Sequence, residues 1–172
     1  MKKPIDILIA IKKPWLEHVT ALLSSSDKPG WQPAQKELAK FWDLASEAYL
    51  RQEPEAVKPI LESWLQTYFV AEMDTGKLSS DVQPLLIPLL SLCEIACMQA
   101  SADQFNRDDR LQFQEEIVPL FNRFQDLAAR LELGMYLHEV RRREKAVRDD
   151  VQRLDETRSS FINTAAHELK TP

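Results

Sequence analysis

Residues 82–100 read VQPLLIPLLSLCEIACMQA, and this stretch decides the fold class. On a helix its apolar residues occupy almost every side, so it offers no face to water. Such a segment belongs at the centre of a helix bundle rather than on its surface. Pro88 is expected to bend this helix or to mark its true start, because proline has no amide hydrogen. The loop MDTGKLSSD, residues 73–81, precedes it, and Ser80 or Asp81 is the predicted helix cap.

The rest of residues 1–130 predicts further helices around that segment. The chain has only three glycines, and residues that favour helix over sheet dominate it. Helices are expected to begin at Pro14, near Pro33 and after Pro54. The isoleucines of residues 4–13 alternate like those of a strand that has no evident partner, and this stretch is left undecided. The residues predicted to face the core are Trp15, Leu16, Val19, Leu22 and Leu23 in the first helix, Leu38, Phe41, Trp42, Ala45, Ala48 and Tyr49 in the second, and Val57, Ile60, Leu61, Trp64, Leu65 and Tyr68 in the third.

Composition and charge argue against several classes of protein. The net charge of -5 supplies no basic field for phosphate backbones, and the basic run 141–143 lies among acidic residues, so nucleic acid is not an expected partner. Cys93 and Cys97 are expected to be buried, reduced thiols, because a zinc site would need two more ligands nearby. Polar residues and prolines interrupt the apolar stretch 82–102, and Asp6 interrupts the apolar N-terminus. We therefore expect no membrane span, no secretory signal and a cytoplasmic location.

From Leu133 onward a heptad seam is present. Its positions alternate at spacings of four and three: Leu133, Leu137, Val140, Glu144, Val147, Val151, Leu154, Arg158, Phe161 and Ala165. A seam of this length predicts a left-handed coiled coil, and a narrow apolar face beside many charges needs a partner. We expect a parallel homodimer through residues 133–165. An exposed single helix with a charged stripe is the alternative.

Polar residues weaken this predicted coil. Glu144 and Arg158 occupy seam positions where a stable dimer has aliphatic side chains. Like charges would also meet across the dimer, in the pairs Arg143 with Arg148 of the partner subunit and Asp150 with Asp155 of the partner subunit. Because a transmission element needs two arrangements of similar free energy, we hypothesise that these polar layers make the coil switchable.

The last residues, 161–172, read FINTAAHELKTP. From His167 to Pro172 they strongly resemble the H-box of histidine kinases, in which a helix carries His-Glu-Leu-Arg/Lys-Thr-Pro. Phe161, six residues before the histidine, is also typical of that family. The resemblance implies the sensory input and signal-transmission part of a two-component sensor histidine kinase. Three domains are then expected: a helical input domain over residues 1–130, a coiled-coil signalling helix over 131–160, and the start of the phosphoacceptor helix over 161–172.

The resemblance implies a role for each matching residue. His167 would accept the γ-phosphoryl group of ATP and pass it to an aspartate of a response regulator. Glu168 would act as the general base for the imidazole proton. Thr171 would position water for the phosphatase reaction. Helical geometry independently points His167 about 140 degrees away from Ile162, so the imidazole is expected to be exposed.

Two positions depart from the family pattern, since Ala166 stands where serine is usual and Lys170 where arginine is commoner. Neither departure removes a catalytic group. In the family, a second dimerisation helix and an ATP-binding domain follow Pro172. We therefore expect ATP and Mg²⁺ to bind there, no cofactor in the present residues, and no autophosphorylation by these residues alone.

Residues 1–130 resemble haem-free globin-like or four-helix regulatory domains only in a general way. The sequence does not indicate which signal they sense. His18 is expected to be a partly buried core histidine rather than a haem ligand, and His138 to lie at the surface. Glu94, on an otherwise apolar helix, is either paired or functional, or it lies on a wet edge. The tryptophans are expected in the core, with a pocket lining as the alternative; they are Trp15, Trp31, Trp42 and Trp64.

Two other functions are alternatives to the histidine-kinase interpretation. One is a non-enzymatic helical module for dimerisation or partner binding, in which the terminal motif is accidental. ATP-binding glycine motifs in the reading frame beyond Pro172 would discriminate against it. The other is a haem protein, which the colour of the purified chain would reveal.

Overall fold

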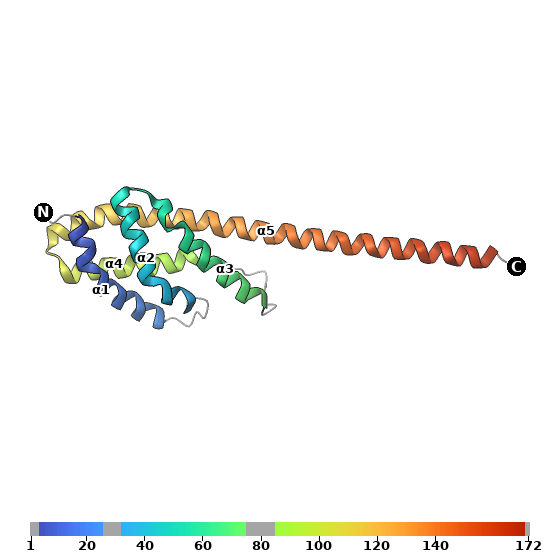
Figure 1. The fold of residues 1–172 in the computed structure, drawn as a ribbon, viewed down its shortest axis with the longest axis horizontal. Coiled ribbons are helices and arrows are strands. Elements are labelled where there is room, and N and C mark those ends of the chain that lie inside the picture. The colour runs from blue at the N-terminus through green and yellow to red at the C-terminus, as the bar shows by residue number, and fades with distance from the viewer. Residues whose placement is uncertain (1–3, 26–31, 75–84, 171–172) are drawn as a thin grey trace. The chain divides into compact units, whose positions relative to one another are not determined.

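The computed structural model describes residues 4–25, 32–74 and 85–170 of the 172-residue chain. Every regular element within these ranges is helical, which confirms the all-α prediction (Figure 1). The globin-like comparison and the coiled coil stay predictions. The elements are α1 (Pro4–Ser24), α2 (Gln32–Arg51), the 3-10 turn η2 (Pro54–Val57), α3 (Lys58–Asp74), α4 (Leu86–Gln104) and α5 (Arg107–Lys170).

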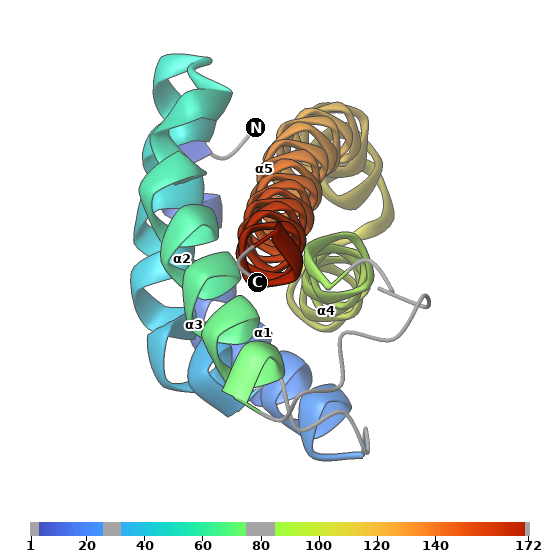
Figure 2. The ribbon, with the colours of Figure 1, turned by 90° about the vertical axis from the view of Figure 1, so that its right-hand side faces the viewer.

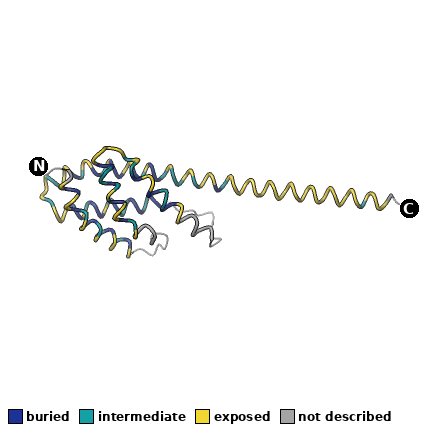
Figure 3. The backbone as a smooth tube through the Cα atoms, viewed as in Figure 1, coloured by how far each residue is buried: buried dark blue, intermediate teal, exposed yellow. Residues whose placement is uncertain are grey.

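The chain divides into two compact units, Met1–Glu132 and Leu133–Pro172, and α5 contributes residues to both. Buried positions gather in α1–α4 and in the early part of α5, whereas almost every position after Leu133 is exposed (Figure 3). The division of function into an input domain, a signalling helix and a phosphoacceptor segment stays a prediction.

The first helix begins ten residues before the predicted start, because α1 starts at Pro4 and includes Pro14 in its interior. Residues 4–13 are therefore helical. Ile7 and Ile11 are buried four residues apart, while Ile9 between them is 69% exposed, so the burial follows the helical period and not the strand period. Pro14 cannot donate to the carbonyl of Ala10, but Ala10 is exposed, and water can satisfy that carbonyl.

The helices α2 and α3 agree closely with the prediction. All six residues expected to face the core from α2 are buried, as are the five of the third set that the structure describes; the side chain of Tyr68 lies outside the described residues. Gln52 ends α2 in a left-handed conformation with φ 57. The amide of Glu53 then bonds the carbonyl of Ala48 at 3.0 Å, an arrangement that satisfies the last carbonyls of the helix.

The helix α4 packs most extensively against α1. It is buried along one side, whereas Ile95 is 46% exposed and Gln99 is exposed on the other, so it is not the fully enclosed central helix that the sequence predicts. It begins at Leu86, which places Pro88 in its first turn, where a missing amide hydrogen costs little. Ser80 and Asp81, the predicted caps, lie outside the described residues; the residue at the cap position is Leu85, whose side chain makes no capping bond. Among the described residues, α4 is the one helix whose length and mean hydropathy of 1.3 would suit a bilayer span.

The interior of the first unit is an aromatic cluster. Trp15 lies 4.7 Å from Trp42 and 6.1 Å from Phe41, measured between ring centroids, and Phe41 contacts Phe124 of α5 edge-on. The indole N–H of Trp15 donates to the carbonyl of Cys93 at 2.9 Å, so the largest side chain of α1 is also tied to α4. The pair of helices α2 and α3 lies on the opposite side of this unit from α4 (Figure 2).

The helix α5 starts with a local cap. Asn106 Oδ1 accepts a hydrogen bond from the amide of Asp109 at 2.9 Å, and Asn106 Nδ2 donates to the Asp109 carboxylate at 3.1 Å. Asp108 and Asp109 also place negative charge at the helix N-terminus, where it is favourable. Pro119 lies inside α5 on an exposed position, so its missing hydrogen bond leaves a carbonyl near water rather than in the core.

Candidate functional site

The second unit presents the predicted seam as an exposed apolar row. Leu133, Leu137, Val147 and Val151 are exposed, Leu154 is 70% exposed and Phe161 is 72% exposed. The two polar seam residues, Glu144 and Arg158, are exposed as well. A row of large apolar side chains facing water over this length is typical of a surface that binds a partner, and the homodimer through it stays a prediction.

Charged side chains beside the seam form hydrogen bonds with one another on the same helix, and the sequence alone did not indicate these bonds. Glu139 accepts from Arg142 Nε at 2.8 Å and from Arg142 Nη2 at 2.9 Å. It also accepts from Arg143 Nε at 2.9 Å. The two guanidinium groups leave the Glu139 side chain only 7% exposed, and the three bonds lower the pKa of its carboxyl to about 2. Arg143, predicted to repel Arg148 of the partner subunit, is thus partly neutralised by its own helix.

This cluster predicts an acid-sensitive local stabilisation. Because the pKa of Glu139 is lowered from 4.5 to about 2, its contribution to helix stability is complete above about pH 4.5 and is lost as the pH falls towards 2. Side-chain carbon chemical shifts should show a midpoint near 2 for this carboxyl. In a variant carrying Arg142→Ala and Arg143→Ala the midpoint should return towards 4.5. A midpoint of about 4 in the unaltered chain would show that the arginine bonds do not form.

The end of α5 carries the residues assigned to phosphoryl transfer. His167 and Glu168 are both exposed, but so are Ile162 at 53% and Leu169 at 89% on the face predicted to be covered. The outward orientation of His167 relative to that face therefore stays a prediction. Adjacent residues of a helix point about 100 degrees apart, so Glu168 and His167 project from neighbouring faces of the helix. Thr171 and Pro172 lie outside the described residues. The helix therefore presents two of the three predicted site residues to solvent.

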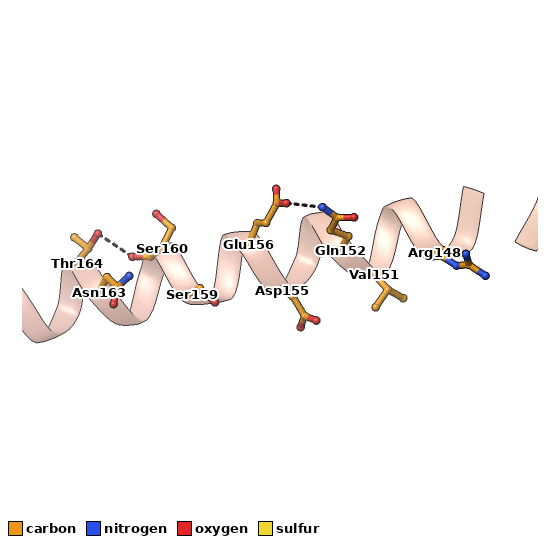
Figure 4. A pocket seen from close by; sticks show the side chains of 9 residues that line it. All are labelled: Arg148, Val151, Gln152, Asp155, Glu156, Ser159, Ser160, Asn163 and Thr164. Atoms are coloured by element: carbon orange, nitrogen blue, oxygen red, sulfur yellow. Dashed lines mark hydrogen bonds between the residues drawn. The ribbon is translucent and has the colours of Figure 1, made fainter. Parts of the chain in front are cut away.

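A polar stripe runs along α5 immediately before these residues. In Figure 4 its side chains project from one helix: Arg148, Val151, Gln152, Asp155, Glu156, Ser159, Ser160, Asn163 and Thr164. Gln152 Nε2 donates to Glu156 Oε1 at 2.9 Å, and Thr164 Oγ1 donates to the carbonyl of Ser160 at 3.0 Å. Because one helix supplies every wall, the stripe is an open surface and not an enclosed ligand pocket.

Of the histidines and the carboxylate singled out in the sequence, His18 and Glu94 in the first unit are paired, and His138 in the second unit is exposed. His18 Nε2 lies 2.8 Å from Asp103 Oδ2, and its side chain is about a third exposed. His138 is exposed, as predicted. Glu94 is half-buried and accepts a bond from Gln125 Nε2 at 3.2 Å; burial raises the pKa of the Glu94 carboxyl, and this bond acts against the rise. Glu94 is thus a paired group between α4 and α5.

The cysteines and tryptophans of the described residues belong to the core. Cys93 and Cys97 are free and fully buried, and burial raises the pKa of both thiols, so neither is a ready nucleophile or metal ligand. Three of the four tryptophans are buried, and Trp31 lies outside the described residues. Across the described ranges, no three histidine, cysteine or acidic side chains gather as metal ligands would.

One polar contact was missed entirely by sequence reasoning. Glu132 Oε1, on α5, accepts hydrogen bonds from the amides of Leu85 and Leu86 at the start of α4, at 2.7 and 2.6 Å. These partners are 47 and 46 residues away in the sequence, so no local motif could have indicated the contact. Glu132 is also the last residue of the first unit.

No protein-family model, curated protein or solved structure matches the chain.

Proposed function

We propose that this chain is the input and signal-transmission part of a cytoplasmic two-component sensor histidine kinase, with His167 as the phosphorylated residue. The observation that carries the proposal is the tract His167 to Pro172, whose imidazole and adjacent carboxylate are exposed near the end of a long helix. An exposed imidazole is accessible to a bulky nucleotide-binding domain, and a neutral ring nitrogen is a competent nucleophile. The carboxylate of Glu168, the next residue along the helix, is the proton acceptor in this proposal.

The chemical step is a phosphoryl transfer. A ring nitrogen of His167 attacks the γ-phosphorus of ATP, the bond from that phosphorus to the β-bridging oxygen breaks, and ADP leaves. The imidazole proton passes to Glu168. A carboxylate oxygen of an aspartate in a response regulator then attacks the phosphorus and releases His167 for another cycle. ATP and Mg²⁺ bind to a catalytic domain outside these residues. In the separate phosphatase reaction, Thr171 positions a water molecule that attacks the phosphoaspartate of the response regulator and releases inorganic phosphate.

The transmission element is a parallel homodimer through residues 133–165. Its support is the exposed apolar seam, whose heptad spacing matches that of a left-handed two-stranded coil. In a parallel dimer both copies of His167 lie at the same end, where one catalytic domain can reach either. Sedimentation that shows only monomer at micromolar concentration would contradict the homodimer.

If the polar seam residues make the coil switchable, replacing them with apolar residues should stabilise the dimer and weaken its response to the stimulus. Replacing Glu144 and Arg158 together with leucine should tighten the dimer about tenfold or more, because two apolar layers replace two charged ones. In the full-length protein the same change should lock autophosphorylation at one level whatever the stimulus. The dimer constant is measured by sedimentation equilibrium, and the response by phosphate labelling.

A matched control lies on the same helix away from the seam. Arg153 is exposed and outside the seam, so Arg153→Leu adds an equal apolar side chain without joining the interface. It should leave the dimer constant and the response unchanged. A double seam variant that still responds fully to the stimulus would count against the switchable coil.

The exposed seam also suits a non-enzymatic dimerisation or partner-binding module, so the discriminating test concerns chemistry. The chain is mixed with a histidine-kinase ATP-binding domain and ATP, and phosphate incorporation is compared between the unaltered protein and His167→Gln. The kinase proposal expects labelling of the unaltered chain alone. The dimerisation module expects none in either.

A further inference from the structure

The start of α4 is capped by a side chain from a distant helix. The residue in the cap position is Leu85, whose side chain cannot accept a hydrogen bond, and Pro88 in the first turn has no amide hydrogen. The Glu132 carboxylate fills this role instead, since its Oε1 accepts from the amides of both Leu85 and Leu86. A negative group at this position also interacts favourably with the helix dipole.

The hydrogen bonds of this cap are strong, but forming them removes water from the carboxylate. Bonds of 2.6 and 2.7 Å from amides to an ionised carboxylate are among the stronger hydrogen bonds in proteins. Glu132 is half-buried, and burial raises the pKa of its carboxyl while the two amide bonds act against the rise. Opening the cap would return both the carboxylate and the amides to water, so the gain from the bonds is partly offset by lost hydration. The net stabilisation by this contact is therefore smaller than two charge-assisted hydrogen bonds alone would give.

A second polar contact aligns with the first along the same helix pair. Gln125, seven residues before Glu132 on α5, donates to Glu94 at 3.2 Å and to Ser91 Oγ at 3.4 Å on α4. The two helices are thus antiparallel, with their register held by two polar contacts within an apolar interface. Apolar side chains tolerate small slides, whereas hydrogen bonds have a narrow range of distance and angle. Of these two contacts, the one at Glu132 directly precedes the predicted seam segment, residues 133–165, here called the connector.

We propose that Glu132 is a positioning residue for signal transmission, a carboxylate clip through which a displacement of the α4 N-terminus changes the connector that begins at Leu133. The proposal rests on the transmission role given above. A signal that moves the start of α4 must either carry Glu132 with it or break its two bonds. Either outcome alters the first turns after Glu132, because they continue the same helix.

Amide hydrogen exchange of the purified chain tests the clip. Glu132→Gln keeps the size of the side chain and one carbonyl oxygen but removes the charge that strengthens both bonds. Exchange of the Leu85 and Leu86 amides should become about tenfold faster, and exchange over residues 133–140 should rise severalfold. Glu115→Gln is the matched control, because Glu115 is an exposed carboxylate on the same helix. It should change neither region.

Amides of the α2 core, such as those of Phe41 and Ala48, report on global stability and should keep their exchange rates in both variants. If Glu132→Gln lowers global stability instead, Glu132→Asp retains the charge with a shorter reach and should give the same two regional changes. Unchanged exchange at Leu85 and Leu86 would overturn the clip. Faster exchange there without any change over residues 133–140 would reduce Glu132 to a structural cap and overturn the proposal.

The exchange measurement needs neither ATP nor a reactive histidine, so its outcome is separate from that of the kinase assignment. His167→Gln protein should show the same dependence on Glu132 as the unaltered chain. If phosphate labelling fails while this coupling is present, the kinase assignment is lost and the clip remains. If labelling succeeds while the coupling is absent, the kinase assignment remains and the clip is lost.

Discussion

His167→Gln is expected to abolish phosphate incorporation into this chain. Glutamine has a similar reach, but its amide nitrogen is not nucleophilic, so no bond to phosphorus can form at this position. In the presence of a histidine-kinase ATP-binding domain and ATP labelled at the γ-phosphate, the loss should be at least about a hundredfold, the scale on which removal of a nucleophile acts. The bound label in the unaltered chain should also be labile in acid, as a phosphorus–nitrogen bond is.

His138 supplies the matched control, since it is an exposed histidine on the same helix. His138→Gln should leave labelling unchanged, which separates a specific site from general reactivity of surface imidazoles. Glu168→Gln should slow labelling without altering the helix, because it removes the proton acceptor and keeps the side-chain size. Equal labelling of the unaltered and His167→Gln chains would remove the basis of the site assignment.

Trp15→Ala is expected to give the largest loss of stability. The Trp15 side chain is fully buried, contacts Phe41 and Trp42, and donates its indole N–H to the Cys93 carbonyl. Truncation to alanine removes these contacts and leaves a large cavity between α1, α2 and α4. The free energy of unfolding should fall by about 4 kcal/mol, as for other buried tryptophan or phenylalanine truncations. Urea denaturation followed by circular dichroism measures the change.

Two further variants divide this loss into its causes. Trp15→Phe keeps an aromatic ring but loses the bond to Cys93, and should cost about 1–2 kcal/mol. Ile9→Ala alters a largely exposed position on the same helix, so it should change stability by less than about 0.5 kcal/mol. A loss below about 1 kcal/mol for Trp15→Ala would contradict the burial of this residue between the three helices.

Helix type and core faces were predictable wherever the apolar period was long. The six core positions of α2 follow directly from 3.6-residue periodicity, which depends only on local geometry. The apolar run of α4 has no such period, so it indicated a buried helix but not which of its sides is exposed. The N-terminal isoleucines were ambiguous, since Ile7 and Ile11 fit both a strand and a helix; the decision came from α4, against which α1 packs.

The sequence by itself determined the all-α class, the heptad spacing of residues 133–165 and the tract from His167 to Pro172, because these depend on the order and spacing of residues along the chain. Only the tertiary structure decided that Glu132 caps α4, that Gln125 pairs with Glu94, and that Trp15 bonds to Cys93. These contacts join residues at least 31 positions apart. The packing of whole helices determines which of these distant residues come into contact, so a local pattern of residues cannot predict the pairs.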